Sequence, residues 1–458
     1  MKKTTFRAIS LLLLFSLVVA FSMPVSSLDY NNTPNTDKVK CVYFYNLEAK
    51  SVIAKKGGGE QISPASSSKI MTGLLACELL CDRLDEVVTI ENKMLTGTQG
   101  TSMRLEDGDR LTILSLIYGT VCGGFNDAAY ALAFIVAGSH SEFVELMNKK
   151  AAELGAKNTN YSNPTGFDDP MQHTTLEDVA VITKAALKNE LYMKISSTVS
   201  KSVTFENGKA DFTIHNRNGL IGSYYTAGYK NAYAKGMIAG FTDLGGYTVI
   251  TSAVINDTNY LCIVMGGINE NGEISSYALA NELIYYASNN LKKQCIIEKD
   301  ELICTIPVKY ALDGVATGED GEDYLNVRMA KDVTAVLPID TDTSQITNKY
   351  HLYSDTLCAP VKKGDIVGVI DFYLDGEFIA SAPLCVNSDV SANTFLIKME
   401  NAKASMSGRT ILIPILLFII LTSIFFFFGA NQKRKTVKEI KMKRYQSTKS
   451  DRTQHKKQ

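Results

Sequence analysis

The sequence lacks every common signature of a metal site. It contains no Cys-X-X-Cys pair, and its nine cysteines and five histidines do not cluster at metal-ligand spacing. It also contains no internal repeat and no low-complexity block. We therefore expect a globular chain with no metal and no cofactor. Several of the scattered cysteines suit packing in the core of an exported protein that does not depend on disulfides.

Charged residues make up 21% and hydrophobic residues 45%, which is an ordinary globular balance, and 458 residues are enough for two domains with additional segments. The net charge of −1 hides an uneven distribution. Residues 431–458 contain 11 Lys and Arg but only 2 Asp and Glu, and with Lys2, Lys3 and Arg7 also set aside, residues 8–430 have a net charge of −13. This acidity argues against nucleic acid as a partner.

The first 27 residues have the pattern of a secretory signal peptide. Lys2, Lys3 and Arg7 precede an apolar run from Ile9 to Met23, and small residues follow it. A basic start, a short apolar run and a small-residue exit are typical of an exported protein. An uncleaved membrane anchor is the alternative interpretation.

Near the other end, residues 411–430 contain no charge, and a helix of this length is long enough to cross a bilayer. The basic tail 431–458 follows directly, and positive charge after a span marks the cytoplasmic side. We therefore expect a single-pass protein of the cell membrane. Its catalytic part would lie outside the cytoplasm, its tail inside, and membrane lipid would contact 411–430 and the tail.

Between these ends, helix-like and strand-like stretches alternate over residues 35–292. Apolar residues recur at helical spacing in 68–84, 111–117, 128–136, 176–187 and 277–291. Strand-like runs bounded by turn residues occur at 42–45, 51–54, 235–241, 247–255 and 260–266. This order predicts an α/β sandwich, in which an antiparallel sheet is flanked by helices and the N-terminal hairpin completes the sheet.

Residues 295–388 show little helical periodicity and predict a small all-β domain. Its clearest feature is a pair of strand-like runs within 366–384, joined at Asp375-Gly376, which is a strong signal for a type I′ hairpin. A polar stalk, 389–410, would connect this domain to the expected span.

Ser66 and Lys69 are the residues best suited to chemistry, at the start of the helix expected over 68–84. Three residues apart on a helix, they share one face. A serine hydroxyl is a weak nucleophile unless a base lies within hydrogen-bond reach, and a lysine amine can be that base where its pKa is lowered. Taken alone, Ser66-Ser67-Ser68 would be only an N-cap, which is the more frequent role of such an isolated match.

Other segments extend this pattern beyond one motif: Asn126-Asp127-Ala128-Ala129, Asn163-Pro164-Thr165-Gly166, His173-Thr174-Thr175, Gly240-Phe241-Thr242-Asp243 and Ala359-Pro360-Val361-Lys362-Lys363-Gly364. In combination with Ser66 and Lys69, they resemble the serine D-alanyl-D-alanine carboxypeptidases, which are the low-molecular-mass penicillin-binding proteins. The resemblance covers about residues 35–388. It implies a DD-peptidase/β-lactamase-like sandwich followed by a β domain.

The resemblance also implies a hydrolase that removes the terminal D-alanine of peptidoglycan stem peptides ending in D-Ala-D-Ala. Ser66 would attack the peptide carbonyl, Lys69 would take its proton, and Asn126 would complete the catalytic set. The implied substrate-binding residues are Gly240, Phe241 and Thr242. Backbone N–H groups of Ser66 and Phe241 would form the oxyanion hole. β-Lactams would acylate Ser66 because they mimic the same amide.

Two motifs depart from the family pattern. The second motif is Ser-X-Asn in the family, and its serine aligns with Gly124. The third is Lys-Thr-Gly, and its first two residues align with Ile238 and Ala239. The chain thus lacks a proton shuttle and the cation and hydroxyl expected to hold the substrate carboxylate. A catalytic proton relay contributes on the order of 10²–10⁴-fold in rate.

Four neighbours are candidates for replacing the missing groups. Lys235 lies three residues before Ile238, so in a regular strand it would point to the opposite face. Cys122 could present a thiol, although a packed core cysteine is its ordinary interpretation. His173 and His215 could support the cleft, but structural roles are expected for both.

Three functions follow from these observations. The first is a working carboxypeptidase, based on Ser66, Lys69 and Asn126. The second is a catalytically impaired module that binds peptidoglycan as a wall-associated scaffold or sensor, based on the departures at Gly124, Ile238 and Ala239. The third is a β-lactamase-like hydrolase, which has no obvious deacylation base and leaves the β domain unexplained.

Overall fold

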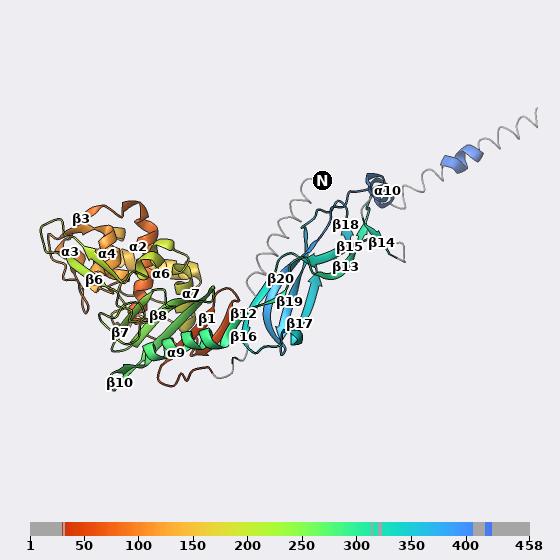
Figure 1. Ribbon diagram of the computed structural model, residues 1–458. Coiled ribbons are helices and arrows are strands. Elements are labelled where there is room, and N and C mark those ends of the chain that lie inside the picture. Colours follow the sequence, from red (N-terminus) through yellow and green to blue (C-terminus); the bar gives the residue numbers. More distant parts are fainter. Residues whose placement is uncertain (1–29, 31–32, 313–314, 319–322, 406–416, 424–458) are drawn as a thin grey trace, which may run out of the picture. The chain divides into compact units, whose positions relative to one another are not determined.

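The computed structural model describes residue 30 and residues 33–312, 315–318, 323–405 and 417–423 (Figure 1). The expected signal peptide 1–27 and basic tail 431–458 lie outside the described residues, as does most of the expected span 411–430. Within the described ranges, no helix is both long and apolar enough to cross a membrane.

A five-stranded antiparallel sheet forms the centre of the N-terminal region, in the order β2-β1-β9-β8-β7. Its strands are β1 (Cys41–Asn46), β2 (Ser51–Lys56), β7 (Ile238–Thr242), β8 (Gly246–Ile255) and β9 (Thr258–Gly267). Tyr43 of β1 pairs with Ile263 of β9, so the N-terminal hairpin completes the sheet as predicted.

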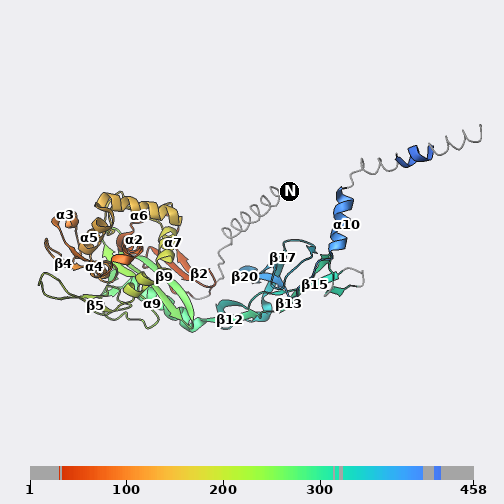
Figure 2. The ribbon, with the colours of Figure 1, turned by 90° about the horizontal axis from the view of Figure 1, so that it is seen from above.

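The two faces of this sheet belong to two separate hydrophobic cores, because successive side chains on a strand point to opposite sides. In β1, Tyr43 and Tyr45 join the larger core, whereas Val42 and Phe44 join the smaller one. The helices packed in the larger core are α2 (Ser68–Leu79), α4 (Ile113–Val121), α5 (Asn126–Ala137), α6 (His140–Leu154), α7 (Leu176–Ala186) and α8 (Glu190–Ser196). Helix α9 (Ser275–Asn290) covers the other face, as Figures 1 and 2 show.

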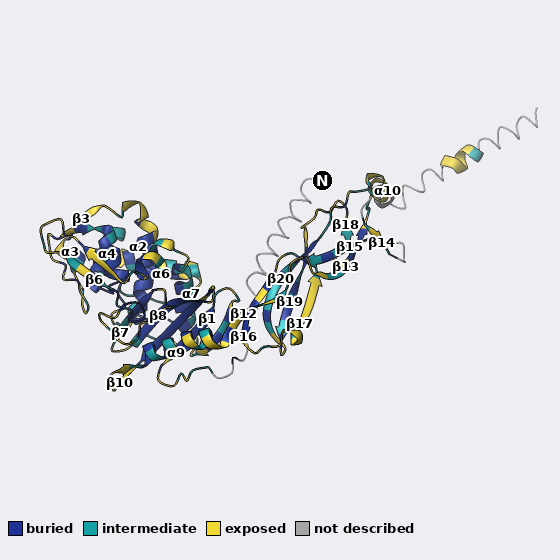
Figure 3. Cartoon of the chain, in the orientation of Figure 1, coloured by how far each residue is buried: buried dark blue, intermediate teal, exposed yellow. Residues whose placement is uncertain are grey.

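Helix α2 is deeply buried in this arrangement (Figure 3), since the ten residues from Ser68 to Cys77 are all buried. The helix predicted over 68–84 is shorter in the structure, because α2 ends at Leu79 and a 3₁₀ turn, η2 (Cys81–Arg83), follows. A hydrophobic pattern alone does not show where the backbone hydrogen bonds change from helical to 3₁₀ spacing.

The predicted helix 111–117 begins later than expected. Arg110–Thr112 form strand β4, which pairs with β3 (Val87–Thr89), and the Thr112 side chain then caps α4 by accepting a hydrogen bond from the Ser115 amide at 3.2 Å. Helices α3 (Asn92–Leu95), α6 and α8 are not among the predicted segments.

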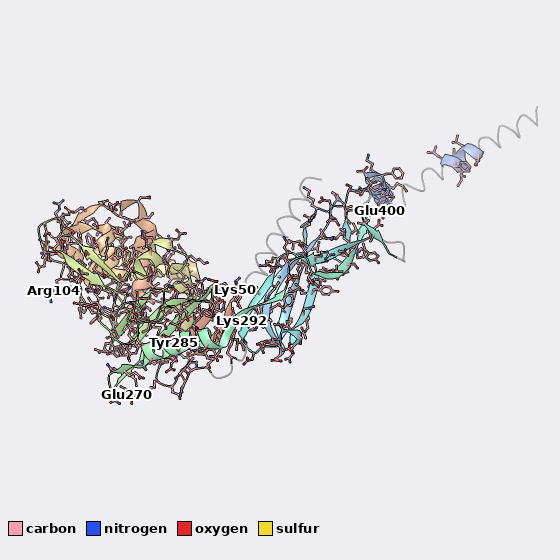
Figure 4. The ribbon with its side chains drawn as sticks, viewed as in Figure 1. Lys50, Arg104, Glu270, Tyr285, Lys292 and Glu400 are labelled. Carbon is pink, nitrogen blue, oxygen red and sulfur yellow. The ribbon has the colours of Figure 1, made fainter. Side chains whose placement is uncertain are left out.

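Two small antiparallel pairs lie at the edges of this region. Strand β5 (Ser200–Val203) pairs with β6 (Phe212–His215), and β10 (Asn269–Glu270) pairs with β11 (Glu273–Ile274). Glu270, labelled in Figure 4, forms an exposed ion pair with Lys38 at 2.9 Å. Exposed pairs of this kind contribute little to stability.

The C-terminal region is β-rich, as predicted. Strand β12 (Leu291–Ile297) pairs with β16 (Val333–Pro338), and a seven-stranded sheet has the order β17-β19-β20-β15-β13-β18, with β14 paired to β15. The remaining bounds are β13 (Leu302–Lys309), β14 (Ala316–Thr317), β15 (Asp323–Met329), β17 (Thr347–Leu352), β18 (Leu357–Cys358), β19 (Ile366–Leu374) and β20 (Glu377–Val386), with a 3₁₀ turn η3 (Thr343–Gln345).

The hairpin expected at Asp375-Gly376 is confirmed, since both residues have positive φ, at 51° and 84°, and they join β19 to β20. Within the predicted stalk 389–410, the described residues include a helix, α10 (Thr394–Ser405). The α/β sandwich followed by a β-rich region is therefore confirmed, and the domain boundaries at 35–292 and 295–388 stay predictions.

Candidate active site

The turn that begins α2 positions Ser66 and Lys69. Ser66 lies in the 3₁₀ turn η1 (Ala65–Ser67), and Lys69 lies in the first turn of α2. Ala65 has a φ of 46°, in the left-handed region that residues other than glycine rarely adopt. The backbone therefore bends sharply directly before the serine, and strain of this kind concentrates at functional sites.

Strand β7 passes directly beside Ser66. A Cβ atom added to Gly240 would meet the Oγ atom of Ser66 and would lie 2.7 Å from its Cβ atom. Because a side chain at position 240 would collide with the serine, glycine alone allows so close an approach. The backbone of β7 therefore lies within contact distance of the serine. The oxyanion hole expected from the backbone N–H groups of Ser66 and Phe241 stays a prediction.

A cleft of about 480 Å³ contains Ser66. All six predicted site residues line it: Ser66, Lys69, Asn126, Gly240, Phe241 and Thr242. The remaining lining residues are Gly100, Thr101, Gly124, Thr165, Phe167, Asp168, Arg217 and Asp243. The fold thus gathers segments far apart in the sequence around one serine.

Lys69 is held where its amine can act as a base. The side chain is only 3% exposed, and its Nζ atom donates a hydrogen bond to the Thr165 carbonyl oxygen at 2.8 Å. Burial lowers the pKa of Lys69, and the positive charge of Arg217 lowers it further, to about 7. A substantial fraction of Lys69 is therefore neutral at physiological pH and can accept a proton.

Asn126 begins α5, and its nitrogen atoms are hydrogen-bonded whereas its side-chain oxygen is not. Its backbone N–H donates to the Thr101 carbonyl oxygen at 2.7 Å, and its Nδ2 atom donates to the Gln99 carbonyl oxygen at 2.5 Å. Its Oδ1 atom is buried and forms no hydrogen bond with any residue that the structure describes. This acceptor is available to an N–H group of a molecule in the cleft, since a buried polar atom is costly when unpaired.

The space that the serine of the second motif would occupy contains the side chain of Arg217. Gly124 has a φ of 66°, and a Cβ atom there would lie 3.0 Å from Cδ and 3.2 Å from Nε of Arg217. Arg217 thus fills the space next to Gly124, and its Nε atom donates to the Gly123 carbonyl oxygen at 3.0 Å. Sequence reasoning did not predict Arg217 as a site residue.

Ile238 and Ala239 contribute no polar group to the cleft. Both are 1% exposed, and consecutive positions on β7 send Ile238 into the larger core and Ala239 into the smaller one. These residues pack the sheet on its two faces, so the polar functions expected of the third motif are absent from these positions.

None of the four suggested replacements lines the cleft. Lys235 is exposed, and its Nζ atom contacts only the Ala232 carbonyl oxygen, at 3.5 Å, among the described residues. Cys122 is a buried core cysteine, and burial raises the pKa of its thiol to about 12. The imidazole of His215 stacks on Tyr224 with ring centres 3.8 Å apart, whereas the backbone of His173 pairs with Asn160.

Asp168 is a second residue that sequence reasoning missed. Its carboxylate accepts hydrogen bonds from the Ser63 hydroxyl at 3.2 Å and from the Leu244 amide at 2.8 Å. It therefore connects the loop after Thr165 to the segment before Ser66 and to the turn after β7. Local sequence contains no signal for such contacts, whereas Arg217 stands in the polar segment Asn216-Arg217-Asn218 directly after β6 and could have been considered.

Comparison with known families gives two matches. Residues 34–269 match the peptidase S11 family, described as D-alanyl-D-alanine carboxypeptidase. Residues 291–392 match the family described as the C-terminal domain of penicillin-binding protein 5.

Individual relatives agree with both matches. The D-alanyl-D-alanine carboxypeptidase DacC of Escherichia coli (strain K12) is 30% identical over 355 residues, which cover 75% of this chain and 82% of the relative. DacF of Bacillus subtilis (strain 168) is 26% identical over 78% of this chain and 87% of its own length. The crystal structure of penicillin binding protein 5 from Haemophilus influenzae is similar with a TM-score of 0.62 and 25% identity, covering 78% of this chain and 99% of that one.

Proposed function

The chain belongs to the D-alanyl-D-alanine carboxypeptidase family, and from this premise we propose that it is a serine carboxypeptidase that removes the terminal D-alanine of peptidoglycan stem peptides. One observation carries the proposal for the site. Lys69, a buried amine with a pKa of about 7, lies one helical turn from Ser66 in a cleft bordered by β7.

The reaction begins when the Ser66 Oγ atom attacks the carbonyl carbon between the last two D-alanines, while the neutral Lys69 amine accepts the hydroxyl proton. The C–N bond then breaks, and D-alanine leaves. Because Gly124 has no hydroxyl, the Lys69 ammonium itself returns the proton to the leaving amine. Water next attacks the carbonyl carbon of the Ser66 ester and gives a proton to Lys69, and the Lys69 ammonium returns that proton to the Ser66 Oγ atom as the acyl–oxygen bond breaks.

β-Lactams are expected to acylate Ser66 by the same route, since their strained amide presents a carbonyl carbon to the same nucleophile. Peptidoglycan and β-lactams are therefore the two ligand classes of the cleft. Asn126 is the residue whose free Oδ1 atom receives an N–H group of the bound peptide.

The test compares the purified protein with its Ser66→Ala variant. Each is incubated with a fluorescent penicillin and, separately, with a peptide ending in D-Ala-D-Ala. We expect labelling and D-alanine release that both require Ser66. Labelling without release would favour the impaired peptidoglycan-binding module instead, a possibility supported by the departures at Gly124, Ile238 and Ala239. If the unaltered protein shows neither labelling nor D-alanine release, the catalytic proposal is overturned.

The same proposal places this enzyme outside the cytoplasm. This placement is based on charge and hydropathy along the sequence. They indicate export through a signal peptide at 1–27, a single span at 411–430 and a cytoplasmic tail at 431–458. The catalytic part would then face the cell wall, where its substrate lies, and membrane lipid would contact 411–430.

A further inference from the structure

Asp127 is a buried carboxylate next to the cleft that the proposed reaction does not use. It lies in the first turn of α5, directly after Asn126, and is only 3% exposed. It forms no ion pair with any residue that the structure describes. A buried charge is costly unless an opposite charge or hydrogen bonds compensate for it. In Asp127 this compensation comes from hydrogen bonds alone.

Three of the four hydrogen bonds to Asp127 come from one loop, residues 97–105. The Oδ2 atom accepts from the Ser102 hydroxyl at 2.6 Å and from the Leu105 amide at 3.0 Å. The Oδ1 atom accepts from the Met103 amide at 3.1 Å and from the Ala128 amide of α5 at 2.9 Å. Hydrogen bonds to an ionised acceptor are roughly twice as strong as neutral ones. The carboxylate therefore joins the loop 97–105 to the first turn of α5.

The loop 97–105 contains a strained bend at the point where Asp127 contacts it. Arg104 has a φ of 63°, in the left-handed region that residues other than glycine rarely adopt. The residues before and after it, Met103 and Leu105, are those whose amides donate to Asp127. Backbone strain of this kind persists only where the surrounding structure holds it. We therefore expect the loop to change its conformation when the carboxylate is removed.

The same loop holds the side chain of Asn126. The Gln99 carbonyl oxygen accepts from the Asn126 Nδ2 atom, and the Thr101 carbonyl oxygen accepts from the Asn126 backbone N–H. A Cβ atom added to Gly100 would lie 2.9 Å from Nδ2, so the loop passes in direct contact with the amide. Because the loop receives the N–H groups of Asn126, the Oδ1 atom is the part of the amide that stays available to a ligand.

We propose that Asp127 is a positioning residue for the reaction: it holds the loop 97–105, and through this loop it fixes the orientation of the Asn126 amide. Asp127 does not line the cleft, so it acts only through Asn126 and the loop. The inference rests on the proposed function, in which the Asn126 Oδ1 atom receives an N–H group of the bound peptide. Asparagine at position 127 would have one acceptor oxygen in place of two, so at least one amide of the loop would lose its acceptor.

The experiment is a double-mutant cycle on acylation by a fluorescent penicillin. We expect Asp127→Asn to lower the second-order rate constant by about 10- to 100-fold, because a displacement near 1 Å in a positioned group can slow a reaction about 100-fold. In a protein that already carries Asn126→Ala, the same substitution should change the rate by less than about twofold. A purely structural role of Asp127 would slow acylation equally in both backgrounds.

Asp178→Asn is the matched control, with circular dichroism and thermal unfolding as checks of folding. Asp178 also lies in the first turn of a helix, α7, is 5% exposed, and does not line the cleft. Its Oδ2 atom accepts from the Asn158 amide at 2.7 Å and from the Thr159 hydroxyl at 2.8 Å. This substitution should lower the thermal stability as Asp127→Asn does, but it should leave the acylation rate unchanged.

Ser102→Ala is a milder variant for the case in which Asp127→Asn does not fold. It removes one donor to the carboxylate from an exposed position and leaves Asp127 itself in place. It should slow acylation by less than Asp127→Asn, and only in proteins that retain Asn126. A Ser102→Ala effect of the same size in the Asn126→Ala background would contradict the proposed role.

The remaining outcomes separate this inference from the proposed function. If the unaltered protein is labelled and Asp127→Asn is labelled at the same rate, the positioning role is overturned and the catalytic proposal remains. The positioning role is also overturned if Asp178→Asn slows acylation as much as Asp127→Asn, or if Asn126→Ala has no effect on the rate. If the unaltered protein is neither labelled nor releases D-alanine, the proposed function and this inference fail together.

Discussion

At the scale of single residues, the protonation of one buried amine governs the proposed chemistry. Lys69 has a pKa of about 7 because burial disfavours its charged form and Arg217 adds a like charge nearby. The side chain needs no acidic partner to act as a base near neutral pH. Its hydrogen bond to the Thr165 carbonyl oxygen keeps the amine in the cleft in either protonation state.

This pKa predicts the pH dependence of acylation. The amine accepts a proton only when neutral, and because its pKa is lowered to about 7, the neutral form dominates above that pH. The second-order rate constant for labelling by a fluorescent penicillin should therefore rise as pH increases through about 7 and level off above it. A rate that is constant between pH 5 and 9 would exclude Lys69 as the base.

Gly240 provides a second test at this scale. In Gly240→Ala the new methyl group would meet the Ser66 Oγ atom, so the nucleophile must move. We expect acylation to slow by about 100-fold, since a displacement near 1 Å at a reacting group can have that effect. Gly59→Ala is the matched control, because a Cβ atom at Gly59 meets no atom within 4 Å. Equal acylation rates in the two variants would contradict the close approach of β7.

At the scale of elements, helix α2 is the part on which the site depends, because it carries Lys69 and packs in the larger core with helices α4 and α8. Gly73, in the middle of α2, lies where this helix passes close to α4 and α8. A Cβ atom there would meet Val121 of α4 and would lie 2.9 Å from the Tyr192 ring of α8.

Gly73→Ala therefore has a predictable sign. In an exposed helix this change stabilises, because alanine has the higher helix propensity. Here we expect it to lower the free energy of unfolding by about 1–3 kcal/mol, since extra volume in a packed core forces neighbours to shift. Urea denaturation of the two proteins measures the difference, and a stabilised variant would show that α2 is less tightly packed than described.

At the scale of the whole molecule, the prediction concerns attachment to the membrane. Removing residues 411–458 should release the protein from the membrane fraction into the soluble exported fraction, because these residues contain the expected span and its basic tail. Fractionation followed by penicillin labelling measures both location and activity. A truncated protein that stays with the membrane and sediments as before would contradict the expected anchor.

Much of the fold could be predicted from local patterns. The hairpin at Asp375-Gly376, helix α7 and strands β8 and β9 were predicted at nearly their observed bounds, because turn chemistry and hydrophobic periodicity depend on neighbouring residues. The prediction was poorer for α6 and for the end of α2. Helix α6 was missed although it has local signals, a capping Ser139 and a left-handed Gly155 at its end, whereas the end of α2 depends on a change of backbone hydrogen bonding.

The sequence by itself determined the order of helices and strands, the pairing of Ser66 with Lys69 on one helical face, and the absence of the usual groups at Gly124, Ile238 and Ala239. Only the tertiary structure decided what surrounds them. It buries Lys69 and lowers its pKa, brings Thr165 to its amine across 96 residues, and places Arg217 beside Gly123 across 94 residues. Burial, electrostatic fields and steric room depend on distance in space, and a chain's local pattern does not contain that distance.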